Sequence, residues 1–325
     1  MRQIADMTRW HGRNDDAEGP MGRRWHQVVQ QLELAQQPNG IALVGFACDA
    51  GVARNQGRIG AAEGPAALRS ILGNLPLRHC MSIVDAGDVV CLSDYAGKDL
   101  ESAQEAFAVL IDDLLSRGLM PIAMGGGHEI AYGSFNGLAR FLAGKRKPAF
   151  APRIGIINFD AHFDMRLSKQ ATSGTPFRQI AEDCQAKDWP FHYLCLGISE
   201  YANTVALFER AKAFGVRWRL DEDMGIVQLD DTLSAVDHFL QGVDHVYLTV
   251  CLDVFPAYIA PGVSAPSARG VTLEVVEPII DRIVASGKVR VADVAELNPE
   301  HDIDHRTARV GARLIARIAE RSHAR

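Results

Sequence analysis

Two apolar runs in this chain, 119–124 and 154–159, each end directly in a cluster of side chains of the kind that bind metal ions. Short runs that are apolar throughout are typical of strands buried on both faces of a parallel sheet. The segments that follow the two runs are Gly125-Gly126-Gly127-His128-Glu129 and Asp160-Ala161-His162-Phe163-Asp164. Since α/β sheets bind their ligands at the carboxyl ends of the strands, the two runs predict both a fold class and the place of a site.

Apolar runs alternate with amphipathic segments along most of the chain. We predict strands at 41–48, 82–86, 119–124, 154–160, 192–198, 245–253 and 289–296, and helices near 65–73, 99–117, 129–145, 203–213, 272–287 and 305–322. Alternation at this spacing predicts βαβ units. We therefore expect an α/β fold, a three-layer αβα sandwich with a mainly parallel, doubly wound central sheet. The polar residues 1–38 are expected to form a partly ordered arm before a single domain at 39–325.

Composition and charge limit the classes of protein to which the chain can belong. Hydrophobic residues make up 47% and charged residues 23%, as in a globular domain with a sizeable core. The formal net charge is -6, and the sequence contains no run of basic residues, so we expect no nucleic-acid partner. No apolar stretch approaches ~18 residues and the N-terminus lacks the apolar part of a signal peptide, so we expect no membrane association and a cytoplasmic protein. The six cysteines form no C-x-x-C pair, which favours buried thiols.

The second cluster has the spacing of a metal site. In an extended strand, residues i, i+2 and i+4 point to one face, so Asp160, His162 and Asp164 can converge. Carboxylates combined with imidazole suit a divalent ion such as Mn²⁺ better than a structural zinc. A lone Asp-x-His segment also occurs in surface loops and as a core histidine with its hydrogen bonds satisfied. His128, which follows the other apolar run at 119–124, favours the metal site.

Two later segments complete a set of motifs. The run 246–253 leads to Ala260-Pro261-Gly262-Val263-Ser264-Ala265-Pro266, and the run 289–295 ends at Glu296. Together with the first two clusters, and in this order, these segments resemble the arginase/agmatinase family of dinuclear manganese ureohydrolases over residues 40–320. The resemblance implies the arginase-like fold. It also implies a small-molecule substrate and a homo-oligomer, either a trimer or a hexamer.

Four segments resemble the family members that hydrolyse N-formimidoyl-L-glutamate to L-glutamate and formamide. One is the segment 260–266 named above, and the others are Arg54-Asn55-Gln56-Gly57-Arg58-Ile59-Gly60-Ala61 with Gly64-Pro65, Asp164-Met165-Arg166 and Ser173-Gly174-Thr175-Pro176-Phe177. An agmatinase would have histidine at position 173. A hydrolase of another guanidino acid, such as guanidinobutyrate, remains an alternative, and so does a binding protein that has the fold but a weakened metal centre.

The resemblance implies two Mn²⁺ ions. One would be held by His128, Asp160, Asp164 and residue 251, and the other by His162, Asp160, residue 251 and Asp253. Two ions ~3.5–4 Å apart lower the pKa of a shared water and supply hydroxide for attack on the amidine carbon.

Position 251 departs from the family pattern, which is Asp-x-Asp where this chain has Cys251-Leu252-Asp253. A thiolate carries the charge of a carboxylate and can ligate through sulfur, but it is softer. We expect a weaker Mn²⁺ or a preference for zinc at one position. The alternative is that Cys251 is a neutral filler and one ion binds tightly.

The resemblance also implies roles for residues around the metals. Asp164 would pass a proton to the leaving amine, and Glu296 would bind the amidinium head through paired hydrogen bonds. Arg166 lies where the family contacts the substrate's α-carboxylate, and a guanidinium there is a bidentate carboxylate receptor. Further candidates for substrate binding are Arg58 and Arg178, for the second carboxylate, and Ser173 and Thr175, as hydrogen-bond donors.

Overall fold

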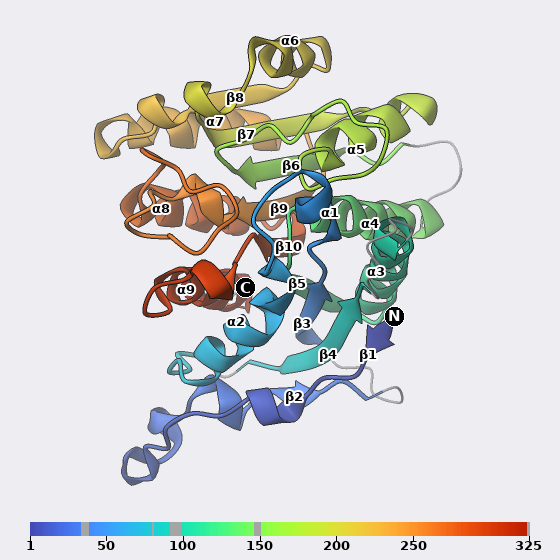
Figure 1. Ribbon diagram of the computed structural model, residues 1–325. Coiled ribbons are helices and arrows are strands. Elements are labelled where there is room, and N and C mark those ends of the chain that lie inside the picture. Colours follow the sequence, from blue (N-terminus) through green and yellow to red (C-terminus); the bar gives the residue numbers. More distant parts are fainter. Residues whose placement is uncertain (34–38, 80, 92–98, 146–150, 324–325) are drawn as a thin grey trace.

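A ten-stranded sheet runs through the centre of the computed structural model (Figure 1). The structure describes all residues except 34–38, 80, 92–98, 146–150 and 324–325. The strands are β1 (Arg2–Gln3), β2 (Gln30–Gln31), β3 (Gly40–Ala47), β4 (Ile83–Val90), β5 (Leu119–Gly125), β6 (Ile154–Phe159), β7 (His192–Ile198), β8 (Arg217–Leu220), β9 (His245–Cys251) and β10 (Val289–Ala295). Their order is β1-β4-β3-β5-β10-β9-β6-β7-β8, with β2 also paired to β4. Only β1 is antiparallel among the described strands, so the prediction of a mainly parallel sheet is confirmed.

Helices cover both faces of the sheet (Figure 1). One face packs against α2 (Gly64–Gly73), α7 (Leu229–Gln241), α8 (Leu273–Ala285) and α9 (Arg306–His323), and the other against α3 (Asp99–Ser116), α4 (Ile130–Lys145), α5 (Pro176–Ala186) and α6 (Val205–Ala213). Alternate residues of each strand enter opposite apolar layers, as Leu43 and Val44 of β3 do. The predicted αβα sandwich is therefore confirmed.

The sheet order brings the four motif-bearing strands together. The strands β5, β10, β9 and β6 are consecutive neighbours and all parallel. Their register is nearly level, since Ala295 lies beside Cys251 and Phe159 beside Val250. The loops that follow these strands consequently open at one edge of the sheet. This edge carries all of the predicted metal ligands.

The described elements that were not predicted from the sequence include α5, α7 and β8. The edge strand β8 alternates arginine with Trp218 and Leu220 and has no apolar run, because it is covered on one side only. The buried residues of α5 are spaced at i, i+3, i+4 and i+7 from Phe177, which is the pattern of an amphipathic helix. That pattern was available in the sequence.

The N-terminal segment packs against the sheet. Its strands β1 and β2 pair with β4, and Trp25 is completely buried. Trp10 Nε1 donates to Asp85 Oδ2 at 2.8 Å, and the same carboxylate accepts from the buried Arg69 guanidinium at 2.7 Å. Residues 34–38 of the predicted arm lie outside the described residues.

Two further expectations concern cysteines and membranes. The thiols of Cys48, Cys184, Cys195 and Cys251 are buried, Cys91 is partly exposed, and Cys80 lies outside the described residues. In the described parts of the chain, none of the helices combines the length and the apolar character that a membrane crossing requires.

Candidate metal centre

A glycine turn after β5 places His128. A side chain at Gly126 would collide with the carbonyl oxygen of Cys48, so only glycine allows this backbone contact. The backbone N–H of His128 donates to Glu296 Oε1 at 2.9 Å, and its ring Nε2 lies 3.0 Å from Thr249 Oγ1. The ring is thereby fixed with its other nitrogen, Nδ1, directed at the site.

The loop after β6 places three ligands, but not through strand alternation. The predicted strand 154–160 ends at Phe159, and Asp164 has a left-handed backbone with φ of 48°. Such a φ is unfavourable for a non-glycine residue and is common where a site imposes the geometry. Asp160 Oδ1 accepts from the backbone N–H of His162 at 2.7 Å. Convergence therefore comes from a tight loop, which the expectation of an extended strand did not describe.

The predicted ligands form two groups that share Asp160. In the first group, His128 Nδ1 lies 2.9 Å from Asp160 Oδ2 and 3.0 Å from Asp164 Oδ2. In the second, His162 Nδ1 lies 3.1 Å from Asp253 Oδ2 and 3.5 Å from Asp160 Oδ1. The ligand atoms of His128, Asp160 and Cys251 lie within 4.8 Å of one another, as do those of Asp160, His162 and Asp253.

Several buried polar atoms in this cluster make no well-aligned hydrogen bond to any described residue. They are His128 Nδ1, Asp253 Oδ1 and Glu296 Oε2. His128 Nδ1 lies near the carboxylates of Asp160 and Asp164 but points squarely at neither. An unsatisfied buried polar atom costs roughly 1–3 kcal/mol, and more when it is charged. Cations placed within the cluster would satisfy these atoms and would balance the negative charges of the buried carboxylates of Asp160, Asp253 and Glu296. The donor set therefore fits two divalent ions.

The protonation of the cluster shows how strongly its carboxylates favour positive charge. Burial alone would lower the pKa of His128, but the adjacent carboxylates of Asp160 and Asp164 raise it well above 6.5. The side chain of His162 is half-buried; desolvation alone would lower its pKa, but the charge of Asp253 together with Asp160 raises it well above 6.5. Burial, with repulsion from Asp160, raises the pKa of Asp164 to about 6. A divalent ion would meet the same electrostatic demand more fully than a proton does.

Cys251 ends β9 at the centre of the cluster and is 1% exposed. Burial and the neighbouring charges of Asp160 and Asp253 raise the pKa of its thiol well above 9.0. A cation beside the sulfur would have to overcome this cost before the thiolate forms. Asp253 follows in the single 3₁₀ turn Leu252–Val254, so the predicted strand 245–253 is two residues too long.

Glu296 follows β10 and has a φ of 73°. Burial and repulsion from Asp253 raise the pKa of its carboxyl to about 8. Burial also raises the pKa of the neighbouring Glu129 to about 8, and this carboxyl accepts from the backbone N–H of Gly51 at 2.7 Å. Glu129 therefore holds the short helix α1 (Ala50–Arg54) against the glycine turn, while Glu296 Oε2 remains unbonded.

The candidate substrate-binding residues of the loop 165–175 differ in exposure. Arg166 is exposed, and its backbone N–H donates to the carbonyl of Gly174 at 2.8 Å. A Cβ added at Gly174 would lie 2.9 Å from Arg166 Cδ, so glycine gives this side chain its room. Ser173 and Thr175 are buried, and Thr175 Oγ1 accepts from the backbone N–H of Thr172 at 2.9 Å. Arg166 is thus the one of the three candidates whose side chain reaches solvent.

Three guanidinium groups hold this loop in place by donating to its carbonyl oxygens. Arg178 Nε donates to Arg166 O at 2.7 Å, and the same side chain pairs with Glu182. Arg210 donates to Met165 O at 2.8 Å, and Arg54 to Ala171 O at 2.9 Å. Sequence reasoning missed Arg210, which lies on α6, because its contact spans 45 residues. In this structure the guanidinium of Arg178 is therefore engaged by the loop and by Glu182.

Arg58 joins two loops of the same edge. Its Nη2 donates to Val263 O, its Nε to Ser264 O at 3.2 Å, and its backbone N–H to Ser264 Oγ at 3.2 Å. Asn298 Nδ2 donates to the carbonyls of Arg58 and Ile59 at 3.1 and 2.8 Å. Asn298, which sequence reasoning did not single out, therefore ties the loop after β10 to the loop that carries Arg58.

The sequence pattern of the arginase family matches residues 39–320. The chain belongs to the arginase family. Among its relatives in that family, a formimidoylglutamase from Ralstonia nicotianae is 61% identical over 321 residues, which cover 98% of this chain and 97% of that protein. A formimidoylglutamase from Aromatoleum aromaticum is 53% identical over 97% of this chain and 92% of that protein.

Solved structures of the arginase family share the fold. The formimidoylglutamase of Bacillus subtilis superposes with a TM-score of 0.78 at 21% identity, covering 90% of each chain. The formiminoglutamase of Trypanosoma cruzi, solved with Mn²⁺, gives a TM-score of 0.76 at 22% identity, covering 90% of this chain and 96% of that one. At these identities the likeness supports the arginase-like fold.

Proposed function

We propose that this arginase-family protein is a metal-dependent hydrolase that converts N-formimidoyl-L-glutamate and water into L-glutamate and formamide. The observation that carries the proposal is the full-length similarity, at 61% identity, to a formimidoylglutamase. The buried ligand cluster at the carboxyl edge of the sheet supports it, because hydrolysis of an amidine needs strong polarisation of its carbon.

The enzyme would hold two Mn²⁺ ions. His128, Asp160, Asp164 and Cys251 would bind one, and Asp160, His162, Cys251 and Asp253 the other. When bound, the pair supplies the Lewis acidity that lowers the pKa of water and polarises the amidine. Asp160 would bridge the ions, and its place in both groups supports this assignment.

Two carboxyl groups act on the reacting part of the substrate. Glu296 is anchored through Oε1 by the backbone of His128, which leaves Oε2 to accept from the amidinium N–H groups. The side chain of Asp164 is 12% exposed, whereas that of Asp160 is fully buried, so Asp164 lies on the solvent-facing side of the cluster. Its free oxygen would deliver a proton to the glutamate nitrogen as the C–N bond breaks.

The loop 165–175 would select the dicarboxylate tail. Arg166 presents a guanidinium to solvent two residues after Asp164, where two parallel hydrogen bonds to a carboxylate are possible. Ser173 and Thr175 belong to the same loop as candidate hydrogen-bond donors. Arg178 and Arg58 remain candidates for the second carboxylate, although their guanidinium groups already donate to loop carbonyls.

The deciding experiment measures release of formamide and glutamate from N-formimidoyl-L-glutamate by chain reconstituted with Mn²⁺. Guanidinobutyrate, agmatine and arginine are run alongside. We expect turnover of the first substrate alone. Turnover of guanidinobutyrate in preference would replace the proposal by a guanidino-acid hydrolase, and no turnover with metal bound would indicate a binding protein.

We also propose that the enzyme is a cytoplasmic homo-oligomer, a trimer or a hexamer, with residues 39–325 as one catalytic domain. A buried thiol among the ligands fits a reducing compartment. Large apolar side chains on the surface support association: Tyr201 is 95%, Val227 87% and Val205 77% exposed. Light scattering on the purified chain tests the oligomer, and a monomer would contradict it.

A further inference from the structure

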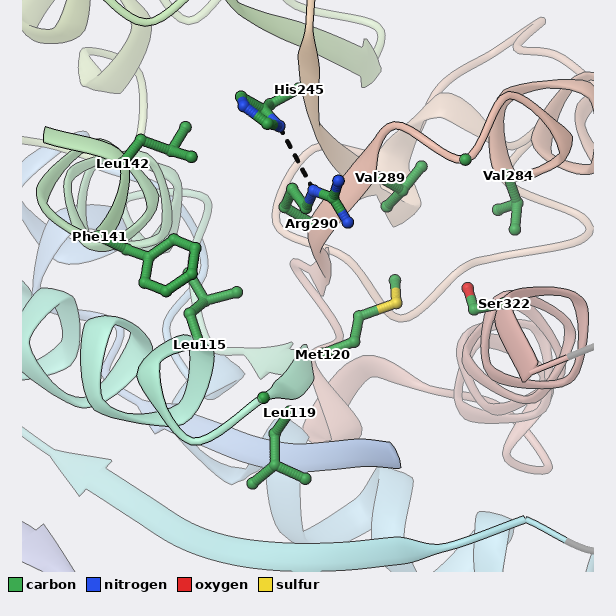
Figure 2. Close-up of a pocket in the computed structure, with 12 residues that line it drawn as sticks. Leu115, Leu119, Met120, Phe141, Leu142, His245, Val284, Val289, Arg290 and Ser322 are labelled. Atoms are coloured by element: carbon green, nitrogen blue, oxygen red, sulfur yellow. Dashed lines mark hydrogen bonds between the residues drawn. The ribbon is translucent and has the colours of Figure 1, made fainter. Parts of the chain in front are cut away.

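Of the cavities lined by described residues, two large ones lie away from the metal centre and differ in charge. Figure 2 shows the first, of about 710 Å³, at the amino-terminal ends of β5, β9 and β10. Its lining is mostly apolar, and its guanidinium, that of Arg290, donates to His245 Nδ1 at 3.3 Å. The second, of about 630 Å³, lies between α2 and α9, which are neighbours in Figure 1. Five arginines line this second cavity, called here the arginine groove.

The arginines come mainly from one face of α9. Arg309, Arg313, Arg317 and Arg321 follow one another at intervals of four residues, which places them in a row along the helix. Arg78, from the segment after α2, lines the same groove. The helix α8 lies beside α9 and carries the acids that partly balance this row.

The charge of the arginine groove is not fully balanced. Arg313 and Arg317 pair with Glu277, and Arg317 and Arg321 with Asp281. Among the described residues, the structure gives the side chains of Arg78 and Arg309 no hydrogen bond or ion pair. Five arginines against Glu277, Asp281 and the groove-lining Glu320 leave an excess of two positive charges.

The apolar part of the groove has a different character. Ile71, Leu75, Pro76 and Ala316 supply it, and we call it the floor. An occupant that satisfies both parts carries two negative charges and an apolar body. Arginine recognises phosphate oxygens through paired hydrogen bonds, and a phosphate monoester carries about −1.5 to −2 charges at pH 7. A volume near 630 Å³ lies in the range of small-molecule sites.

We propose that the arginine groove binds a phosphate monoester of an apolar group, of the class of nucleoside monophosphates. Arg78 and Arg309 supply the positive charge that the phosphate neutralises, and the base or a similar ring lies on the apolar floor. This site is separate from the metal centre and does not depend on the proposed function.

The test is calorimetric titration of the Mn²⁺-loaded chain with AMP, with inorganic phosphate, adenosine and succinate as probes of its parts. We expect AMP to bind, phosphate to bind more weakly, and adenosine and succinate not to bind. Binding should weaken when sodium chloride rises from about 50 to about 300 mM, since exposed charges are screened. The double variant Arg78→Gln with Arg309→Gln should lose roughly tenfold or more in AMP affinity.

Two further variants separate the groove from other causes. Ala316→Trp fills the apolar floor and should abolish AMP binding while both unpaired arginines remain. Arg282→Gln removes an exposed arginine that pairs with Asp237 outside the groove and should leave AMP affinity unchanged. Circular dichroism establishes that each variant is folded.

Three results would overturn the proposal. They are absence of AMP binding by the wild-type chain, equal binding of succinate and AMP, and unchanged AMP affinity in both groove variants. A change of oligomeric state in the folded groove variants, seen by light scattering, would identify the groove as an interface between copies and would equally refute a ligand site.

Discussion

Replacing Cys251 by aspartate tests how the cluster binds its second metal ion. The thiol is buried, and its pKa lies well above 9.0. Even an ordinary thiol, with a pKa of about 8.5, costs about 2 kcal/mol to deprotonate at pH 7, and burial beside the charges of Asp160 and Asp253 adds to this cost. An aspartate is of nearly the same size and is readily ionised beside two divalent cations. Cys251→Asp should thus bind the more weakly held Mn²⁺ at least about 30-fold more tightly at pH 7.

The assay is calorimetric titration of metal-stripped protein with Mn²⁺, together with the metal content after dialysis. The wild-type chain should show one tight and one weaker site, and Cys251→Asp two tight sites with higher activity at limiting Mn²⁺. Zinc should show a smaller gain, because the lost thiolate is a better ligand for zinc. Cys184→Ala, which removes a buried thiol of α5 outside the cluster, is the control and should change neither site. Equal Mn²⁺ affinities in wild type and Cys251→Asp would refute the reasoning.

Three other outcomes follow from the geometry. Arg166→Ala should raise KM for N-formimidoyl-L-glutamate about tenfold or more, and an equal rise for N-butylformamidine, which has no carboxylate, would show that Arg166 does not bind the tail. Because the pKa values of His128 and His162 lie well above 6.5 before metal binds, both carry protons at pH 7 that Mn²⁺ must displace. Binding should release protons and weaken as pH falls, which titration in buffers of different ionisation enthalpy measures; no proton release would contradict the raised pKa values. Removal of metal by a chelator should lower Tm, since a ligand at about 100 times its Kd stabilises by about 2.7 kcal/mol, and an unchanged Tm in calorimetry would argue against metal bound in the native cluster.

Most of the fold was predictable because it depends on local patterns. Runs such as 119–124 and 154–159 are apolar throughout, and a strand buried on both faces requires this. The alternation with amphipathic helices then fixes a parallel sheet, since parallel strands need long crossover connections. The edge strand β8 was missed because it is only partly buried and therefore contains polar residues instead of an apolar run.

The sequence also predicted which residues can ligate metal, but it did not predict how the backbone brings them together. Alternation along a strand was expected to bring Asp160, His162 and Asp164 together. The chain instead leaves the strand at Phe159 and turns through a left-handed Asp164. Such a conformation is stabilised by surrounding contacts, among them the hydrogen bond from Asn203 Nδ2 to Ala161 O at 2.8 Å, and local preference alone disfavours it.

The sequence by itself therefore determined the buried strands of the central sheet, the residues that can ligate metal and the substitution at Cys251. The tertiary structure alone decided which strands are neighbours, and so placed β10 and β9 between β5 and β6. It also decided which arginines hold the loop 165–175 in place, as Arg178 and Arg210 do, and which one is left exposed. The physical reason is range: helix and strand formation depend on residues a few positions apart, whereas charge pairing and burial depend on residues that meet only after the sheet has assembled.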